Sequence, residues 1–438
     1  MLQPPISHWF SPLRSAGVLL LGKTTQGVLS IAYLALAART LGIAEFGVLV
    51  VLNGLVVSVS EIARFDSWQV VLHYGTKPLE AGNKLRFHEV LKFALLLDIA
   101  GAVAGLAIVL LGLSAAFELF NLPSEHQEAA RIFSVGVVFL ISTGGANGVL
   151  RLLDRFDLIS WQTTIAPVIR LSGTLVLFAL GGDLESFLWL WLTGTVIARS
   201  TLHYFAWREL SRRNLLDGLD GSLGTPLTTD GGVWRFALGT SANATLAVVD
   251  KHAGLLAVGW LLGPASAGFY RVALHVAELL IKPNRAFLAP AIYPELARHA
   301  ARDTTDARSR MMWHSMLIVG GVSIAVFIGL AVFGQYMVQT IFGPGFDAAY
   351  GVMIFLALAG VITNCIFPLE PLLVSIGRVR LTVLVRVASA MIYFALLYIL
   401  LLEIGLVGAG IASCAYAGVR AILLGWFTRR NFTFHRNG

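Results

Sequence analysis

The sequence predicts an all-α integral membrane protein with about twelve transmembrane helices. Of its 438 residues, 57% are hydrophobic and 13% are charged, and the mean hydropathy is +0.77. This composition leaves too little polar surface for a water-soluble globule of this size. A membrane span needs about 20 apolar residues, and the chain offers twelve such stretches. They lie near 15–38, 44–63, 90–114, 130–150, 158–180, 186–207, 234–261, 267–294, 312–334, 350–375, 382–402 and 405–427.

The charges between these stretches alternate, and this pattern predicts the orientation of the chain. Segments rich in Lys and Arg resist translocation and stay in the cytoplasm. Such residues gather in the even-numbered segments and in the tail, whereas the odd-numbered segments are mainly acidic or neutral. The basic positions include Lys77, Lys84, Arg86, Arg151, Arg155, Arg208, Arg212, Arg213, Arg298, Arg302, Arg308, Arg310, Arg378, Arg380, Arg429, Arg430 and Arg436, and the main exceptions in odd segments are Arg39 and Arg131. We therefore expect both termini in the cytoplasm.

The first stretch is interpreted as a retained span. It carries Lys23 in its middle, and no small-residue cleavage site follows it. A removable signal peptide would have an uninterrupted apolar region and such a site.

A polar, glycine-containing segment divides the chain almost at its midpoint. Residues 208–232 include five glycines after Leu216, a composition typical of a flexible linker. The sequence therefore predicts an N-terminal lobe of six spans over 1–207, a cytoplasmic linker over 208–232, and a C-terminal lobe of six spans with a short tail over 233–438.

Two short matches indicate that the lobes are related. The segment 41–47 after the first span resembles 262–268 after the seventh, with an offset of 221 residues. The segment 153–155 also resembles 376–378, with an offset of 223. Because six is an even number, both lobes would insert in the same orientation, as in transporters built from parallel repeats.

The strongest polar pattern lies in the eighth span. Arg271, His275, Glu278, Lys282 and Arg285 step by 4, 3, 4 and 3 residues, so they share one helix face. An ionisable group in hydrocarbon needs a partner or a watery cavity. A balanced salt-bridged seam would match its charges, whereas this stripe has three fixed cations and one acid. We expect a water-filled cavity, with the interhelical seam as the alternative.

Other spans add polar residues to the same picture. Lys23 shares a face with Gln26, Ser30 and Tyr33 in the first span, and Asp250 precedes Lys251 in the seventh. Further embedded cations are Arg170, Arg199, Arg386 and Arg420, and the embedded acids include Asp98 and Glu370. Singly, each of these is more typical of a structural pair or a snorkelling end residue. Together they make the interior positive, which favours anions and above all phosphate.

Several other functions are excluded or disfavoured. The net charge of +7 follows from the membrane orientation, so nucleic acid is not expected as a partner. Cys365 and Cys414 both fall in spans, where a zinc site or disulfide framework would need more partners. The segment 17–24 matches the literal phosphate-loop pattern but is apolar and follows no strand. We expect no metal, no cofactor and no enzymatic activity.

The chain resembles the polysaccharide-export branch of the multidrug/oligosaccharidyl-lipid/polysaccharide exporter superfamily, the lipid-linked oligosaccharide flippases. The resemblance rests on residues 38–47 after the first span, Asp250, 262–270 before the eighth span and 292–298 at its end. It implies two six-helix bundles around a central cavity and alternating access. It further implies a bacterial inner-membrane location, an undecaprenyl-pyrophosphate-linked oligosaccharide as cargo, and membrane lipids and other polysaccharide-assembly membrane proteins as partners.

These observations give a first functional hypothesis with two alternatives. The flippase would hold the pyrophosphate on Lys23, Lys251, Arg271, Lys282 and Arg285. Coupling or charge balance would fall to Asp250, His275 and Glu278, by proton, sodium or membrane potential. The first alternative is a proton- or sodium-coupled multidrug exporter of the same fold. The second is a polysaccharide polymerase or ligase, which the short outer segments disfavour.

Overall fold

The computed structural model describes residues 7–217, 227, 230–278, 305–375 and 378–434. The chain divides into two compact units, Met1–Leu256 and Ala257–Gly438, and each is described by itself. Helices account for the regular structure throughout the described residues. This confirms the predicted all-helical class.

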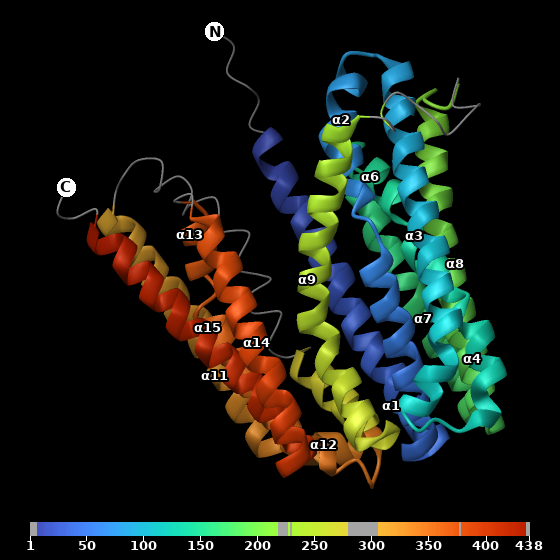
Figure 1. The fold of residues 1–438 in the computed structure, drawn as a ribbon, viewed down its shortest axis with the longest axis vertical. Helices are drawn as coiled ribbons and strands as arrows, with labels where there is room; N and C mark the ends of the chain where they lie inside the picture. Colours follow the sequence, from blue (N-terminus) through green and yellow to red (C-terminus); the bar gives the residue numbers. More distant parts are fainter. Residues whose placement is uncertain (1–6, 218–226, 228–229, 279–304, 376–377, 435–438) are drawn as a thin grey trace. The chain divides into compact units, whose positions relative to one another are not determined.

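Unit 1 is a bundle of long helices that run back and forth between two ends. Its elements are α1 (Ser7–Ala63), α2 (Ser67–Glu80), α3 (Lys84–Leu119), η1 (Ser124–His126), α4 (Gln127–Ser134), α5 (Gly136–Ile141), α6 (Gly144–Leu152), α7 (Phe156–Leu180), α8 (Leu184–Arg212) and α9 (Gly231–Leu262). Within the bundle α1 packs along α7, α7 along α8, and α2 against both α3 and α6. Figure 1 shows α2 and the start of α3 at one end of this unit and α4 at the other.

Unit 2 contains the end of α9, a helical stretch over 264–278, and five further helices. These are α11 (Thr305–Phe342), α12 (Ala348–Cys365), α13 (Leu369–Ser375), α14 (Val379–Ile404) and α15 (Leu406–Phe434). In this unit α15 packs against both α12 and α14, and α11 packs against α12.

Eight helical runs among the described residues are long and apolar enough to cross a membrane. The first of them, Thr25–Glu80, contains two of the expected spans. α8 is missing from the eight because its polar and charged side chains lower its hydropathy. The structure therefore supports a polytopic helical membrane protein, and the count of twelve spans stays a prediction.

Positive backbone angles recur at the turns that join the helices. Gly42 inside α1 has φ 73° and ψ −179°, a conformation open to glycine and strained for other residues. The matching Gly263 after α9 has φ 84°. Gly181 and Gly405 both have φ 71°, and they are 224 residues apart. The repeat that the sequence suggested thus has a counterpart in the backbone.

The expected end of span two, at residue 63, coincides with the end of α1 at Ala63. After three non-helical residues, 64–66, the chain resumes as α2 up to Glu80, a helix that the sequence did not predict. The expected span four is interrupted in a similar way at Ser142 and Thr143, between α5 and α6. Broken helices of this kind leave backbone groups without intrahelical partners.

Exposed Trp and Tyr side chains lie near both ends of unit 1. Trp189 is 46% exposed and lies about 8 Å from the start of α8 at 1.5 Å per residue. Trp161, Tyr204 and Trp207 are 72%, 53% and 56% exposed and lie about 29 to 35 Å from the same end of the bundle. Aromatic belts sit at the two interfaces of a bilayer. We call the end near Gly181 the turn end, and the end that carries Lys77, Lys84 and Arg155 the basic end.

The basic end of unit 1 has a well-packed hydrophobic core. Phe87, Leu150 and Leu202, from α3, α6 and α8, are at most 1% exposed. Further support comes from His88, whose Nε2 lies 2.8 Å from the carbonyl oxygen of Leu215. An ion-pair network of Arg155 with Asp157 and Glu209 joins the start of α7 to the end of α8. This packing holds the helices that carry the polar residues described next.

Candidate functional site

The structure describes part of the polar stripe predicted in the eighth span. Arg271, His275 and Glu278 lie in the helical stretch 264–278, and all three are partly buried. Arg271 makes no hydrogen bond or ion pair with another described residue. Lys282 and Arg285 lie outside the described residues. Their grouping with the first three stays a prediction.

Three other predicted residues lie in helices whose side chains are not described at those positions. Lys23 is in α1, and Asp250 and Lys251 are in α9. Their backbone is helical, as the sequence predicts. Their roles as binding or coupling residues stay predictions.

A second set of cations is fully described, in the interior of unit 1. Arg170 on α7 donates from Nη2 to the Thr195 hydroxyl at 3.0 Å and to the Trp191 carbonyl at 3.4 Å. Its guanidinium also lies over the rings of Tyr33 and Trp191, at 5.9 and 5.2 Å. Its Nε is buried and finds no acceptor among the described residues. The guanidinium of Arg170 is therefore held in place, and its Nε–H remains available to a ligand.

Arg199 on α8 lies between the other cations. It is partly buried and within electrostatic reach of Arg170, Arg64 and Glu61. No carboxylate lies within ion-pair distance of Arg199 in the described part of the chain. Glu61 is the acid that acts electrostatically on Arg199. The Oε2 atom of Glu61 lies 3.4 Å from Nε2 of His252. Among the described side chains, Arg199 thus has no close counter-ion.

Arg64 occupies the break between α1 and α2. Its Nε is 4.0 Å from Asp66 Oδ1, and its side chain is 34% exposed. Asp66 is occupied in other ways, since Gln69 donates to its Oδ2 at 3.1 Å. The contact between Arg64 and Asp66 is thus long, and the buried carboxylate of Asp98 is a second acid within electrostatic reach of Arg64.

The three arginines stand at different depths along the bundle. At 1.5 Å per residue they lie about 15, 22 and 32 Å from the turn end, in the order Arg170, Arg199 and Arg64. We call them the arginine ladder. Three acids lie within electrostatic or ion-pair reach of the ladder, namely Glu61, Asp66 and Asp98. It runs from the basic-end aromatic belt to about the middle of the bilayer.

Guanidinium groups arranged in this way suit a phosphate or pyrophosphate. Arginine presents planar forked donors that match phosphate oxygens, and a low-dielectric surrounding strengthens such contacts. The sequence identified Arg170 and Arg199 as embedded cations. It missed Arg64 because that residue stood at the expected end of a span. The signal that could have found it is the polar pair Arg64 and Asp66 followed by a further helical segment.

Unit 2 holds a charge cluster of a different kind. Glu370, at the start of α13, accepts from Arg386 at 3.0 Å and also pairs closely with Arg420. These three side chains come from α13, α14 and α15, and all are partly buried. The interpretation of these embedded residues as a structural pair is therefore confirmed for this cluster.

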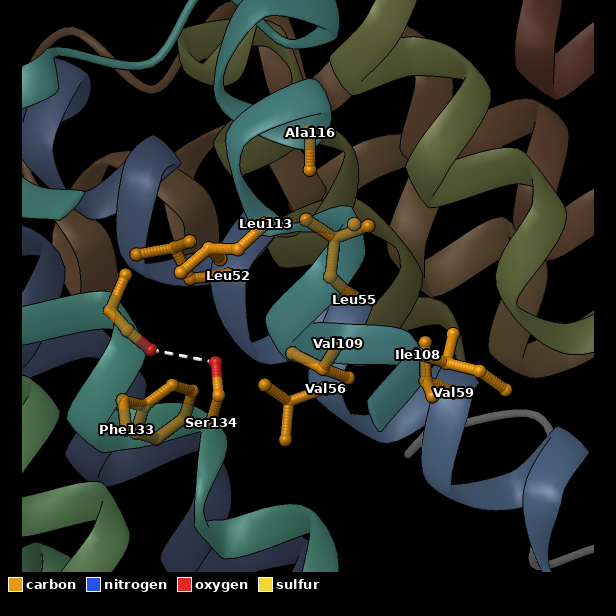
Figure 2. Close-up of a pocket in the computed structure, with 12 residues that line it drawn as sticks. Leu52, Leu55, Val56, Val59, Ile108, Val109, Leu113, Ala116, Phe133 and Ser134 are labelled. Atoms are coloured by element: carbon orange, nitrogen blue, oxygen red, sulfur yellow. Dashed lines mark hydrogen bonds between the residues drawn. The ribbon is translucent and has the colours of Figure 1, made fainter. Parts of the chain in front are cut away.

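The pocket shown in Figure 2 is apolar and lies toward the turn end of unit 1. It has a volume of about 160 Å³ and is lined by residues of α1, α3 and α4, among them Leu52, Val109 and Phe133. The Ser134 hydroxyl in this pocket donates to the Ala130 carbonyl at 2.7 Å. Since its hydroxyl is already used, the pocket offers hydrocarbon contacts and no recognition of a charged group.

Comparison with known proteins gives concordant results. The family of polysaccharide biosynthesis proteins matches residues 99–350, more than half of the chain. The inner membrane protein YghQ of Escherichia coli (strain K12) is 28% identical over 364 residues, which cover 80% of this chain and 99% of that protein. This likeness and the apolar helices identify a multi-pass inner membrane protein.

Solved transporter structures share the fold at low sequence identity. An inward-facing multidrug resistance MATE family transporter of the MOP superfamily superposes with a TM-score of 0.76 at 13% identity, over 96% of both chains. The lipid II flippase MurJ in an inward closed conformation gives a TM-score of 0.69 at 12% identity, over 97% of this chain and 88% of that one. At these identities the likeness shows the fold alone, and that fold is a transporter fold.

Proposed function

The chain belongs to the polysaccharide biosynthesis protein family, and from this premise we propose that it is a flippase for a lipid-linked oligosaccharide. Its cargo is an undecaprenyl-pyrophosphate-linked repeat unit, which it moves from the cytoplasmic to the periplasmic leaflet of the inner membrane by alternating access. The observation that carries the proposal is the arginine ladder. A headgroup that bears two phosphates needs such contacts to replace its hydration shell.

The proposal includes an architecture finer than the described helices. Twelve spans form two six-helix bundles, over 1–207 and 233–438, around a central cavity, with residues 208–232 as the cytoplasmic linker. Both termini and the basic end face the cytoplasm, because Lys and Arg concentrate there. The positive-φ turns at Gly42 and Gly263 support two parallel repeats.

The depths of the three arginines suggest an order of contacts. A headgroup that enters from the cytoplasmic leaflet meets Arg64 at the aromatic belt, then Arg199, and then Arg170 near the bilayer centre. Each step exchanges one guanidinium for the next, and the lipid tail stays in the hydrocarbon. In a region of low dielectric the guanidinium groups attract the anion at each step.

The residues proposed from the sequence complete the cavity. Lys23, Lys251, Arg271, Lys282 and Arg285 provide further cationic contacts. Asp250, His275 and Glu278 balance charge or couple transport to an ion gradient. Arg271 supports this part of the proposal, since it is partly buried and makes no ion pair with a described residue. Other membrane proteins of polysaccharide assembly are its proposed partners.

Deletion of the gene, followed by analysis of lipid-linked intermediates, tests the proposal. We expect the intermediate to accumulate in the inner leaflet and wild type to clear it. Arg199→Gln should lower the clearance rate about tenfold or more, as expected for loss of a charge-assisted hydrogen bond worth about 1.5 to 3 kcal/mol. Arg86→Gln is the matched control, because Arg86 is exposed and pairs with Glu89 at 2.6 Å. Full clearance by Arg199→Gln would remove the ladder from the mechanism.

A multidrug exporter is the second candidate, and the likeness to the MATE family transporter favours it. The two functions are separable by one variant. If Asp250→Asn abolished dye efflux and left clearance of the lipid-linked intermediate intact, the exporter would be the better account. The ladder disfavours this result for cationic drugs, which it repels.

A further inference from the structure

One buried carboxylate connects three helices at the basic end of unit 1. Asp98 on α3 is 2% exposed. Its Oδ1 accepts from the Ser67 hydroxyl at 2.6 Å, and its Oδ2 accepts from the backbone N–H of Gly145 at 2.8 Å. No Lys or Arg among the described residues lies within ion-pair distance of it. Both of these hydrogen-bond donors are therefore neutral, and Arg64 acts on the carboxylate electrostatically from beyond ion-pair distance.

Both donors stand where a broken helix resumes. Ser67 is the first residue of α2, directly after the break at 64–66, and Gly145 is the second residue of α6, directly after Ser142 and Thr143. The first N–H groups of a helix have no intrahelical acceptor and carry a partial positive charge. The carboxylate thus accepts from one such N–H, that of Gly145 in α6, and from the side-chain hydroxyl of the residue that begins α2.

Two glycines allow the backbones at the two helix breaks and in α3 to approach closely. A Cβ on Gly144 would lie 1.9 Å from the Ser67 hydroxyl oxygen, and a Cβ on Gly101 would lie 2.7 Å from the Ala63 carbonyl oxygen. Both glycines are therefore required for the contact. The face of α3 that carries Asp98 and Gly101 therefore packs against the chain at both helix breaks, and Gly105 on the same helix approaches Ile141 and Ala63 closely as well.

The corresponding break in unit 2 is fastened differently. The chain is non-helical at 366–368 between α12 and α13, 224 residues after Ser142. There Glu370 is held by the guanidinium groups of Arg386 and Arg420. The joint in unit 1 thus uses a hydroxyl and a backbone N–H as donors, whereas the joint in unit 2 uses two guanidinium groups.

We propose that Asp98 is a positioning residue for transport. Its carboxylate holds the starts of α2 and α6 together, and these two helices pivot at this joint during transport. The same contact holds Arg64 in place beside Arg199. Arg64 follows directly from the end of α1 and precedes Ser67 by three residues, so release of Ser67 frees the segment that carries this guanidinium. The inference rests on the proposed function for its role in transport. The geometry of the joint does not depend on the cargo.

The test uses the full-length protein in membranes, with Cys365→Ser and Cys414→Ser and a single reporter, Ser142→Cys, at the break in span four. The measured quantity is the labelling rate of the reporter by a membrane-impermeant maleimide. We expect Asp98→Asn to raise the rate about tenfold, because it removes one charged acceptor of two hydrogen bonds. Ser67→Ala should raise it severalfold. The matched control is Gly112→Ala, also on α3, where a Cβ meets nothing within 4 Å.

A double-mutant cycle separates positioning from general damage. Ser67→Ala added to Asp98→Asn should raise the labelling rate by less than the two single changes together predict, since both act on the contact between Ser67 and Asp98. Additive effects, or an unchanged rate in folded Asp98→Asn protein, would overturn the inference. If Asp98→Asn does not fold, the milder Ser67→Ala decides on its own by the same measure.

The outcome for the cargo is read separately, in the clearance of the lipid-linked intermediate. Faster labelling together with slower clearance supports the whole inference. Faster labelling with unchanged clearance overturns the transport role of Asp98 and leaves the proposed function intact. Failure of wild type to clear the intermediate overturns the proposed function, whatever the labelling rate.

Discussion

The chemistry of unit 1 depends on how single arginines are held. Arg170 is fixed by Thr195 and by two aromatic rings, which leaves its buried Nε as an open donor. For Arg199 the described residues show no comparable hydrogen bond or ring contact, and it interacts with its neighbours through its charge. Position 170 therefore requires the shape of a guanidinium group, whereas position 199 requires only a positive charge.

Exchange for lysine distinguishes these two roles. Arg170→Lys keeps the charge but loses the planar fork and the stacking on Tyr33 and Trp191, so we expect clearance of the lipid-linked intermediate to fall about tenfold. Arg199→Lys keeps the point charge, and clearance should stay within about threefold of wild type. The measurement is the rate of clearance at matched expression. Equal loss in both variants would show that the two arginines are not held differently.

At the scale of helices, the sequence predicted the ends of the outer turns better than the breaks. Gly42 and Gly263 follow apolar runs and stop the helix through their own backbone freedom, a local property. α2 was missed because its apolar residues are mixed with Lys77, Pro78 and Glu80, which reads as a polar connection. Asp98 was identified as an embedded acid. Its two donors are 31 and 47 residues away, and no local pattern links them.

The turn at Gly42 gives a prediction for stability. Gly42→Ala places a Cβ on a residue with φ 73° and ψ −179°, and such strain costs about 1 to 3 kcal/mol. No other atom lies within 4 Å of that Cβ, so the cost is one of backbone conformation alone. We expect a lower midpoint of thermal unfolding by fluorescence-detected size exclusion. Gly112→Ala in α3, a helical glycine with equally open surroundings, serves as the control.

An unchanged midpoint for Gly42→Ala would mean that the turn relaxes to another conformation at no cost. Gly263→Ala should reproduce the loss, because its φ of 84° is of the same kind. A loss at Gly42 without one at Gly263 would argue against equivalent turns in the two lobes.

At the scale of the molecule, the proposed orientation of unit 1 rests on two features. One is the set of exposed Trp and Tyr side chains near its two ends, and the other is the basic end, which we propose faces the cytoplasm. Between these ends the sequence showed that cations exceed acids, but it could not show which of them meet. The ladder depends on α1, α7 and α8 packing side by side, which is a property of the folded chain.

The most direct test of the central claim is the binding of undecaprenyl pyrophosphate to the full-length protein in lipid nanodiscs, measured by native mass spectrometry. We expect wild type and the Arg86→Gln control to bind it, Arg199→Gln to bind it about tenfold or more weakly, and none of the three to bind uncharged undecaprenol comparably. Equal binding of undecaprenol by wild type, or undiminished binding of the pyrophosphate by Arg199→Gln, would contradict the claim that the arginine ladder recognises the headgroup.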